Sequence, residues 1–203
     1  MLGGKLTHNY ATTDEYTIQI SGNITNLGQT AFASNTFKKV ILGEPITSIE
    51  AYCFAGCSNL EEIILPNTLT ILKQGAIVSC PKLSSITIPD NVTVIEDSCF
   101  ANDTNLDNVI LSNSLKTIGN DCFGNCGKIS FIDIPSSVTS IGFNSFSNCT
   151  SLSEIGLNWD ASNIIDYTNI RDAFNPLQSF IIPTGTIDLY IANGYPSNRL
   201  IER

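Results

Sequence analysis

Cysteine is the residue type in this chain with the clearest capacity for chemistry, and four cysteines recur at one spacing. The interval between Cys57 and Cys80 equals that between Cys126 and Cys149 (80 minus 57, 149 minus 126). Thiolates bind zinc, and two thiols can form a disulfide. A zinc site needs four converging ligands, and a pair such as Cys53 and Cys57 is explained by the repeat alone, so we expect no metal site.

The remaining cysteines share a second position, directly before a large apolar residue. Cys53, Cys99 and Cys122 occupy the position that Ala76 and Ser145 fill in other repeats. Exchange of cysteine with alanine and serine indicates a small buried slot, so we predict buried free thiols. A disulfide between neighbouring repeats, for example Cys57 with Cys80, is compatible with the roughly 4.8 Å separation of stacked strands.

Other groups that could act in acid or base catalysis are few. His8 is the only histidine, and no nucleophile is visibly paired with it. Two carboxylates can hydrolyse a glycosidic bond, and Glu61 with Glu62 or Asp166 with Asp172 are the pairs to consider. Such pairs are more often solvated surface groups. We therefore predict no catalytic residue and no cofactor.

A repeat of about 23 residues, a length typical of solenoid proteins, positions these cysteines. Each position of the repeated cysteine is preceded, three positions earlier, by one of Phe54, Ile77, Phe100, Phe123 and Phe146. Asp103 replaces the cysteine in the third of these repeats. Every repeat also carries a short segment of alternating apolar residues, which is typical of a strand with one buried face. The alternating pairs are Val40 and Leu42, Ile63 and Leu65, Ile86 and Ile88, Val109 and Leu111, Ile132 and Ile134, and Ile155 and Leu157.

The end of each strand and the segment after it complete one coil. Pro66, Pro89 and Pro135 directly follow three of the strands, and proline has no amide hydrogen to continue a strand ladder. A second apolar pair follows, as in Val92 and Ile95. One coil cannot bury this many apolar side chains alone, so the pattern predicts a solenoid of stacked coils.

Weaker copies extend the repeat in both directions to eight strands, from Ile18 and Ile20 to Phe180 and Ile182. The interval from Ile155 to Phe180 is longer than the regular one (180 minus 155, compared with 155 minus 132), and the phenylalanine and cysteine spacing is lost there. We expect a single domain divided into an N-terminal cap (1–17), regular coils of about 23 residues (18–157), an inserted loop with a degenerate coil (158–179), and a last strand with a C-terminal cap (180–203).

Two segments, "IPSSVTSIGFNSFSNC" and "IPDNVTVIEDSCF", show the repeat most clearly. This pattern resembles the BspA-like class of leucine-rich repeats, over roughly residues 18–190. The resemblance implies a right-handed coil with a parallel β-sheet on its concave face and short strands, turns or 3-10 segments on its convex face. The ending "IIPTGTIDLYIANGYPSNRLIER" looks like the helical C-terminal cap of that family. The resemblance also implies a surface-exposed or secreted protein that binds a protein ligand, such as a host or matrix protein.

Composition restricts the partners. The formal net charge is −9, with only 10 Lys and Arg residues, which argues against nucleic acid and against anionic membranes as partners. No apolar run approaches the ~20 residues needed to cross a bilayer. The start, "MLGGKLTHNY", lacks the apolar stretch of a signal peptide, so we expect either an intracellular chain or one whose leader was removed.

Residues between the buried strand positions must point outward, because side chains alternate between the faces of a strand. Among them Ile64, Thr87, Ile110 and Phe131 predict a contiguous apolar strip, and Asp133 and Glu154 are expected at its edge. Exposed apolar strips tend to be contact sites. A sheet face also favours β-branched residues without any partner.

The sequence thus favours a non-enzymatic protein-binding or adhesion module. One alternative is a parallel β-helix enzyme that acts on polysaccharides, which has coils of similar length but needs clustered carboxylates. A second alternative is a structural spacer within a longer surface protein.

Overall fold

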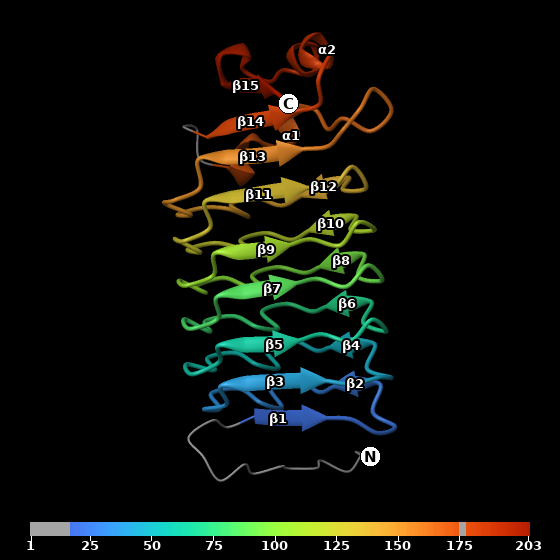
Figure 1. The fold of residues 1–203 in the computed structure, drawn as a ribbon, viewed down its shortest axis with the longest axis vertical. Coiled ribbons are helices and arrows are strands. Elements are labelled where there is room, and N and C mark those ends of the chain that lie inside the picture. Colours follow the sequence, from blue (N-terminus) through green and yellow to red (C-terminus); the bar gives the residue numbers. More distant parts are fainter. Residues whose placement is uncertain (1–16, 175–177) are drawn as a thin grey trace.

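The computed structural model describes residues 17–174 and 178–203, which form one stack of parallel coils (Figure 1). Every coil contributes one strand to the same side of the stack, here called the strand face. In chain order these strands are β1 (Thr17–Ile20), β3 (Lys39–Leu42), β5 (Glu62–Ile64), β7 (Ser85–Thr87), β9 (Asn108–Ile110), β11 (Phe131–Ile134), β13 (Glu154–Leu157) and β14 (Ser179–Ile182). The predicted solenoid with a parallel sheet is confirmed.

Within this face, β1, β3 and β5 pair in parallel in that order, as do β7 with β9, and β11 with β13 and β14. Lys39 lies opposite Glu62, and Phe131 lies opposite Glu154, so the members of each pair are one repeat apart in the sequence. The period-two pattern explains the register, because the alternate residues of β5, β7 and β9 are buried and exposed in turn.

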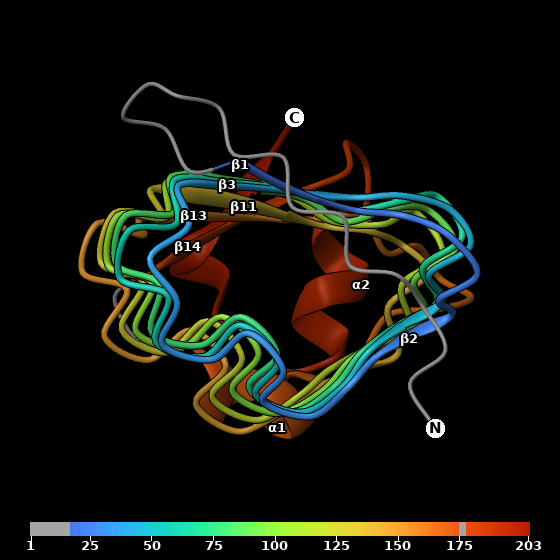
Figure 2. The same ribbon diagram turned by 90° about the horizontal axis from the view of Figure 1, so that it is seen from below.

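The opposite side of the coil carries a second parallel sheet of very short strands. Its members are β2 (Asn26–Leu27), β4 (Ser48–Ile49), β6 (Ile71–Leu72), β8 (Val94–Ile95), β10 (Thr117–Ile118) and β12 (Ser140–Ile141). Figure 2, which looks along the stack, shows these segments superposed from coil to coil. The second apolar pair of each repeat supplies their buried residues, such as Leu72 and Ile95.

A column of aromatic rings fills the interior. The ring centroids of Phe100 and Phe123 are 5.2 Å apart, and those of Phe123 and Phe146 are 5.3 Å apart. The planes of both pairs differ by only 7°. The repeat position imposes this geometry, because equivalent side chains of stacked coils occupy equivalent places. Ile77 fills the same column where phenylalanine is absent and is fully buried.

Glycine permits the close approach of coils at one bend. A Cβ atom at Gly142 would lie 2.5 Å from the backbone nitrogen of Asn120, and one at Gly119 would lie 2.5 Å from the backbone nitrogen of Asp97. Backbone atoms cannot move aside as a flexible side chain can, so both positions require glycine.

The C-terminal end departs from the repeat and closes the core. It contains the helix α1 (Tyr167–Ile170), the 3-10 turn η1 (Arg171–Ala173), the helix α2 (Ile187–Ala192), the 3-10 turn η2 (Ser197–Arg199) and the strand β15 (Leu200–Glu202). Viewed along the stack, α2 lies across the end of the coils (Figure 2). The Tyr190 hydroxyl group on α2 is buried, and its single hydrogen is shared between the carbonyl groups of Leu157 and Trp159, each at 3.1 Å.

Phe174 continues the aromatic column although its sequence spacing is irregular. Its ring stacks on that of Phe146 at 5.1 Å, although the two residues are further apart in the sequence than Phe123 and Phe146 are. The inserted residues of this coil therefore leave the column in place. Of the expected N-terminal cap (1–17), only Thr17 lies within the described residues, and it begins β1. Among the described residues, no helix is long and apolar enough to span a membrane.

Candidate functional site

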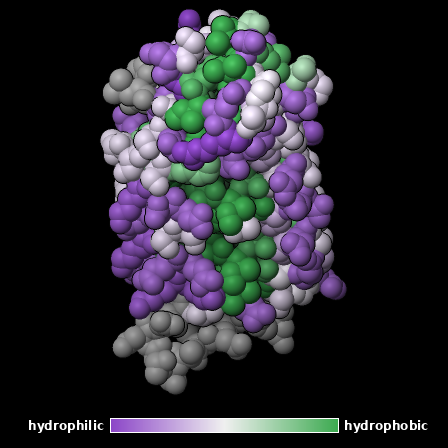
Figure 3. Space-filling model, turned by 45° about the horizontal axis from the view of Figure 1, so that its top comes forward, coloured by the Kyte–Doolittle hydropathy of each residue, from purple (hydrophilic) through white to green (hydrophobic). Residues whose placement is uncertain are grey.

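The strand face presents the outward residues expected from the sequence. Thr87 is exposed, and the exposed fractions are 41% for Ile64, 52% for Ile110 and 44% for Phe131. We call these four residues the strand-face strip. Thr87 lies directly opposite Ile110 in the register, which makes these two residues neighbours on one face. The space-filling view shows apolar side chains gathered along the middle of the molecule with polar residues on both sides (Figure 3).

Phe131 also has an internal role that sequence patterning did not indicate. Gly156 on β13 is buried although its position faces outward. A Cβ atom added to Gly156 would lie 3.2 Å from the Phe131 ring and 2.2 Å from the Asp133 carboxylate. The ring and the carboxylate therefore cover the glycine, so part of the Phe131 side chain packs within the free protein.

The acidic residues of the strand face have partners within the chain. The Lys39 ammonium group lies 2.6 Å from the Glu62 carboxylate, and Arg203 lies 3.5 Å from Glu154. Asp133 accepts a hydrogen bond from the Asn158 side-chain amide at 2.8 Å. Asp133 and Glu154 do flank Phe131, as the sequence predicted, but these bonds reduce their availability to a partner.

All seven cysteines are free and buried, which confirms the predicted buried thiols. Four of them form a regular ladder. The Cys57, Cys80, Cys126 and Cys149 thiols each donate to the carbonyl group of a core residue on the preceding coil, at 3.1–3.2 Å. Burial raises the pKa of the Cys149 thiol to about 12, so it is protonated at neutral pH.

Other candidate groups for metal binding or catalysis are dispersed. Within the described residues, no group of three or more histidine, cysteine, aspartate or glutamate side chains is placed to hold a metal ion. Asp166 accepts a hydrogen bond from the Thr168 amide at the start of α1, and hydrogen bonding to Thr168 lowers the pKa of its carboxyl group. Asp172 forms an ion pair with Arg171. His8 lies outside the described residues.

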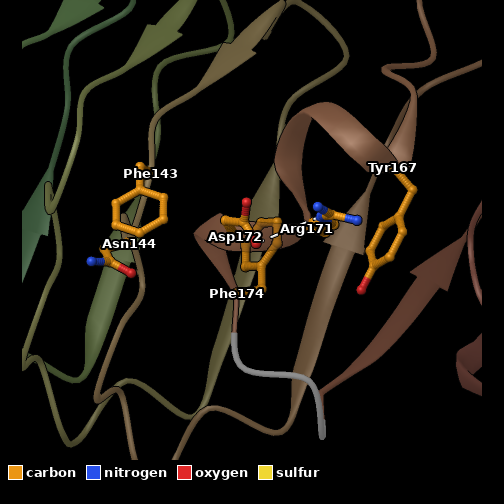
Figure 4. A pocket seen from close by; sticks show the side chains of 6 residues that line it. All are labelled: Phe143, Asn144, Tyr167, Arg171, Asp172 and Phe174. Atoms are coloured by element: carbon orange, nitrogen blue, oxygen red, sulfur yellow. Dashed lines mark ion pairs between the residues drawn. The ribbon is translucent and has the colours of Figure 1, made fainter.

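A second candidate site, absent from the sequence predictions, lies where the regular coils end. A cavity of about 420 Å³ opens between the bend after β12 and the segment containing α1 and η1. We call it the end pocket, and Figure 4 shows its side chains. Its lining residues are Phe143, Asn144, Tyr167, Arg171, Asp172 and Phe174. Phe143 was the available signal, because Gln74, Asp97 and Asn120 occupy the same position in earlier coils.

The repeat pattern matches a known family model. Residues 10–105 and 73–190 match the BspA type leucine rich repeat region, with six copies. The chain belongs to the BspA-type leucine-rich repeat family. The resemblance inferred from the proline, phenylalanine and cysteine positions is therefore confirmed. No curated protein matches the chain at a significant level.

Solved structures of bacterial leucine-rich repeat proteins share this fold. A leucine-rich repeat protein of T. pallidum is 22% identical with a TM-score of 0.61, over 93% of this chain and 94% of that one. The pneumococcal vaccine antigen PcpA is 24% identical with a TM-score of 0.56, over 92% of this chain and 41% of that one. A leucine-rich cell surface protein of Faecalibacterium prausnitzii is 19% identical with a TM-score of 0.55, over 85% of this chain and 64% of that one. At these identities the likeness shows the fold alone.

Proposed function

We propose that this BspA-type chain is a non-enzymatic protein-binding or adhesion module, and that the strand-face strip is the centre of its binding surface. The observation that carries the proposal is the exposure of Ile64, Ile110 and Phe131 on the same outward face of the strands. Apolar side chains exposed to water do not stabilise the protein, whereas contact with a partner would remove their apolar area from water and favour binding.

The charge of the chain favours one type of protein partner. The net charge is −9, and the acidic residues Asp133 and Glu154 flank the strip. A partner with an apolar centre and basic groups around it would complement this surface. Because the flanking acids are already bonded within the chain, they guide orientation and approach more than they add binding energy. We propose an extracellular host or matrix protein of this kind as the ligand.

Two features favour binding over polysaccharide hydrolysis. Hydrolysis of a glycosidic bond needs two carboxylates on either side of the scissile bond. Glu62 and Glu154 instead pair with cations of the same chain, and Asp133 covers Gly156. A location at the cell surface or outside the cell fits this proposal, since two of the solved relatives are named as a cell surface protein and a vaccine antigen.

Surface plasmon resonance with a panel of purified extracellular-matrix and serum proteins tests the proposal. We expect at least one panel protein to bind, and Ile110→Asp to weaken that binding about 30-fold or more, since central apolar contacts are often worth about 2 kcal/mol or more. Ile110 is half exposed, so the thermal midpoint of the variant should stay close to that of the unchanged protein.

Lys82→Ala provides the control, because Lys82 is an exposed residue on a bend that bonds to Asn59 at 2.7 Å. This variant should bind like the unchanged chain. Absence of binding to every panel protein would contradict the proposal. Equal binding by Ile110→Asp and Lys82→Ala would place the contact outside the strand-face strip.

A further inference from the structure

The end pocket lies away from the surface proposed above. Viewed along the stack, α1 lies on the side of the coil opposite β1, β3 and β11 (Figure 2). Phe143 follows β12, which belongs to the sheet on that opposite side. A ligand in the end pocket therefore does not compete with a protein on the strand-face strip.

Phe143 has no structural explanation in the repeat. It is 58% exposed, the largest exposed fraction among the large hydrophobic side chains that the structure describes. It lies in a turn, so the preference of aromatic residues for strands does not account for it. At this position earlier coils use polar side chains to join one coil to the next. For example, Asn120 bonds to Asp97 and accepts a hydrogen bond from the Phe143 amide at 2.8 Å.

The polar groups of the pocket are planar and accessible, and the opposite charges of Arg171 and Asp172 cancel each other. The Arg171 guanidinium group lies 3.6 Å from the Asp172 carboxylate, and both side chains are 60% exposed. Asn144 adds an amide on the side of Phe143 (Figure 4). The paired charges leave the lining without net charge, so it offers hydrogen-bond donors and acceptors without selecting for an ionic ligand.

Tyr167 forms the far wall and is held in place. Its hydroxyl group accepts a hydrogen bond from Arg199 at 3.1 Å, and its ring packs against Phe180 and Tyr195. Phe174 is buried in the aromatic column beneath the pocket. The Tyr167 and Phe174 sides of the pocket are therefore fixed before any ligand arrives, which reduces the entropic cost of binding there.

We propose that the end pocket binds a neutral carbohydrate. A sugar ring has an apolar face of C–H groups and a rim of hydroxyl groups. The exposed ring of Phe143 can pack against the apolar C–H face of the sugar, because aromatic faces carry partial negative charge and make dispersion contacts. The hydroxyl groups of the sugar can form hydrogen bonds with the donors and acceptors of Asn144, Arg171 and Asp172. The volume of about 420 Å³ falls within the roughly 300–1,000 Å³ typical of small-ligand sites.

A printed panel of neutral oligosaccharides, including glucans, mannans, galactans and N-acetylglucosamine oligomers, identifies a ligand. Isothermal titration calorimetry then measures its affinity for the full chain and its variants. We expect binding to at least one oligosaccharide, and a loss of at least tenfold in affinity on Phe143→Ala. Asp172→Asn should also weaken binding, because it removes an acceptor and the partner of Arg171.

Phe131→Ala is the matched control, since it removes a phenylalanine of similar exposure from the strand face. It should leave oligosaccharide affinity unchanged. The proposal is overturned if no neutral oligosaccharide binds at millimolar concentration, or if Phe143→Ala and Phe131→Ala have equal effects. Binding of only sulfated or carboxylated sugars would also overturn it. The protein-binding function is tested separately with Ile110→Asp on the strand face, so failure here leaves that proposed function untouched.

Discussion

Each thiol of the ladder joins its coil to the preceding coil through one hydrogen bond. Cys126 donates to the Phe100 carbonyl group at 3.1 Å, and Cys149 donates to that of Phe123 at the same distance. A weak S–H donor suits this position because it fits a small apolar slot and still bonds to a carbonyl group. All four thiols are protected from solvent, and burial also raises the pKa of Cys126 and Cys149, which suppresses formation of the reactive thiolate at those two positions.

Thiol labelling tests this account. A maleimide reagent applied to the native chain at neutral pH should modify essentially none of the seven cysteines, because all are buried. All seven should react after denaturation in guanidinium chloride, as counted by mass spectrometry. Rapid native labelling of Cys57, Cys80, Cys126 or Cys149 would contradict the ladder.

Asp103 is the exception within the ladder. Its carboxyl group is buried, one oxygen accepts a hydrogen bond from the Cys80 amide at 2.6 Å, and the other oxygen has no bonding partner. Burial raises the pKa of this carboxyl group well above its ordinary value of 3.8. The Cys80, Cys99 and Cys126 thiols interact electrostatically with this carboxyl group, and a charge on Asp103 raises their pKa values.

Asp103 should therefore make stability depend on pH. The folded chain holds this proton to higher pH than the unfolded chain does, so the stabilisation is complete below about pH 4 and is lost as pH rises through the folded pKa. Relative to Asp103→Cys, the free energy of unfolding should decline as pH rises, with a difference of about 1–3 kcal/mol at neutral pH. Urea denaturation of both proteins from pH 4 to pH 9 measures this. A constant difference across that range would show that Asp103 does not titrate on folding.

Among the elements, the bend after each short strand depends on close backbone contact. Gly142 and Gly119 follow β12 and β10 directly, and each leaves room for the backbone of the preceding coil. The bend at Gly142 also determines where Phe143 emerges, so the geometry of the end pocket rests on this packing.

Gly142→Ala should destabilise the fold by roughly 1–3 kcal/mol, because the added methyl group would overlap backbone atoms at 2.5 and 2.6 Å. Gly28→Ala is the control, since no atom lies within 4 Å of a Cβ at that position. Chemical denaturation of both variants gives the comparison. Equal stability of the two proteins would mean that the coils separate easily at the Gly142 bend.

The sequence alone predicted the elements of the regular coils and missed features where the repeat is irregular. The strands and their faces were predictable because Ile63, Ile86 and Val109 recur at one interval with period-two alternation. Phe174 was missed because an insertion changed its interval while its ring kept its place in the column. The cover of Phe131 over Gly156 was missed because spacing gives the face of a residue but not the diagonal contacts of its side chain.

The whole molecule behaves as a linear array, because its coils bond to the coils directly before and after them. Such arrays derive their stability from the contacts within each unit and between neighbours. Phe123 lies in the middle of the array, between the rings of Phe100 and Phe146. Its loss therefore affects two interfaces at once.

Phe123→Ala should lower the free energy of unfolding by about 3–5 kcal/mol. Hydrogen exchange should also increase in the coils on both sides, since their interfaces lose contacts. Denaturation and exchange mass spectrometry measure the two effects. A change below about 1 kcal/mol would show that this position does not belong to the core.

The backbone bonds between coils have a consequence for inheritance. The Phe100 amide donates to the carbonyl group of Cys122, and the Phe123 amide donates to that of Ser145, both at 2.8 Å. A coil copied in frame by unequal recombination would meet the same donors and acceptors above and below it. Adding or removing one whole coil would thus preserve the backbone bonds at both junctions. The length of the solenoid is therefore easier for evolution to change than the conformation of any single coil.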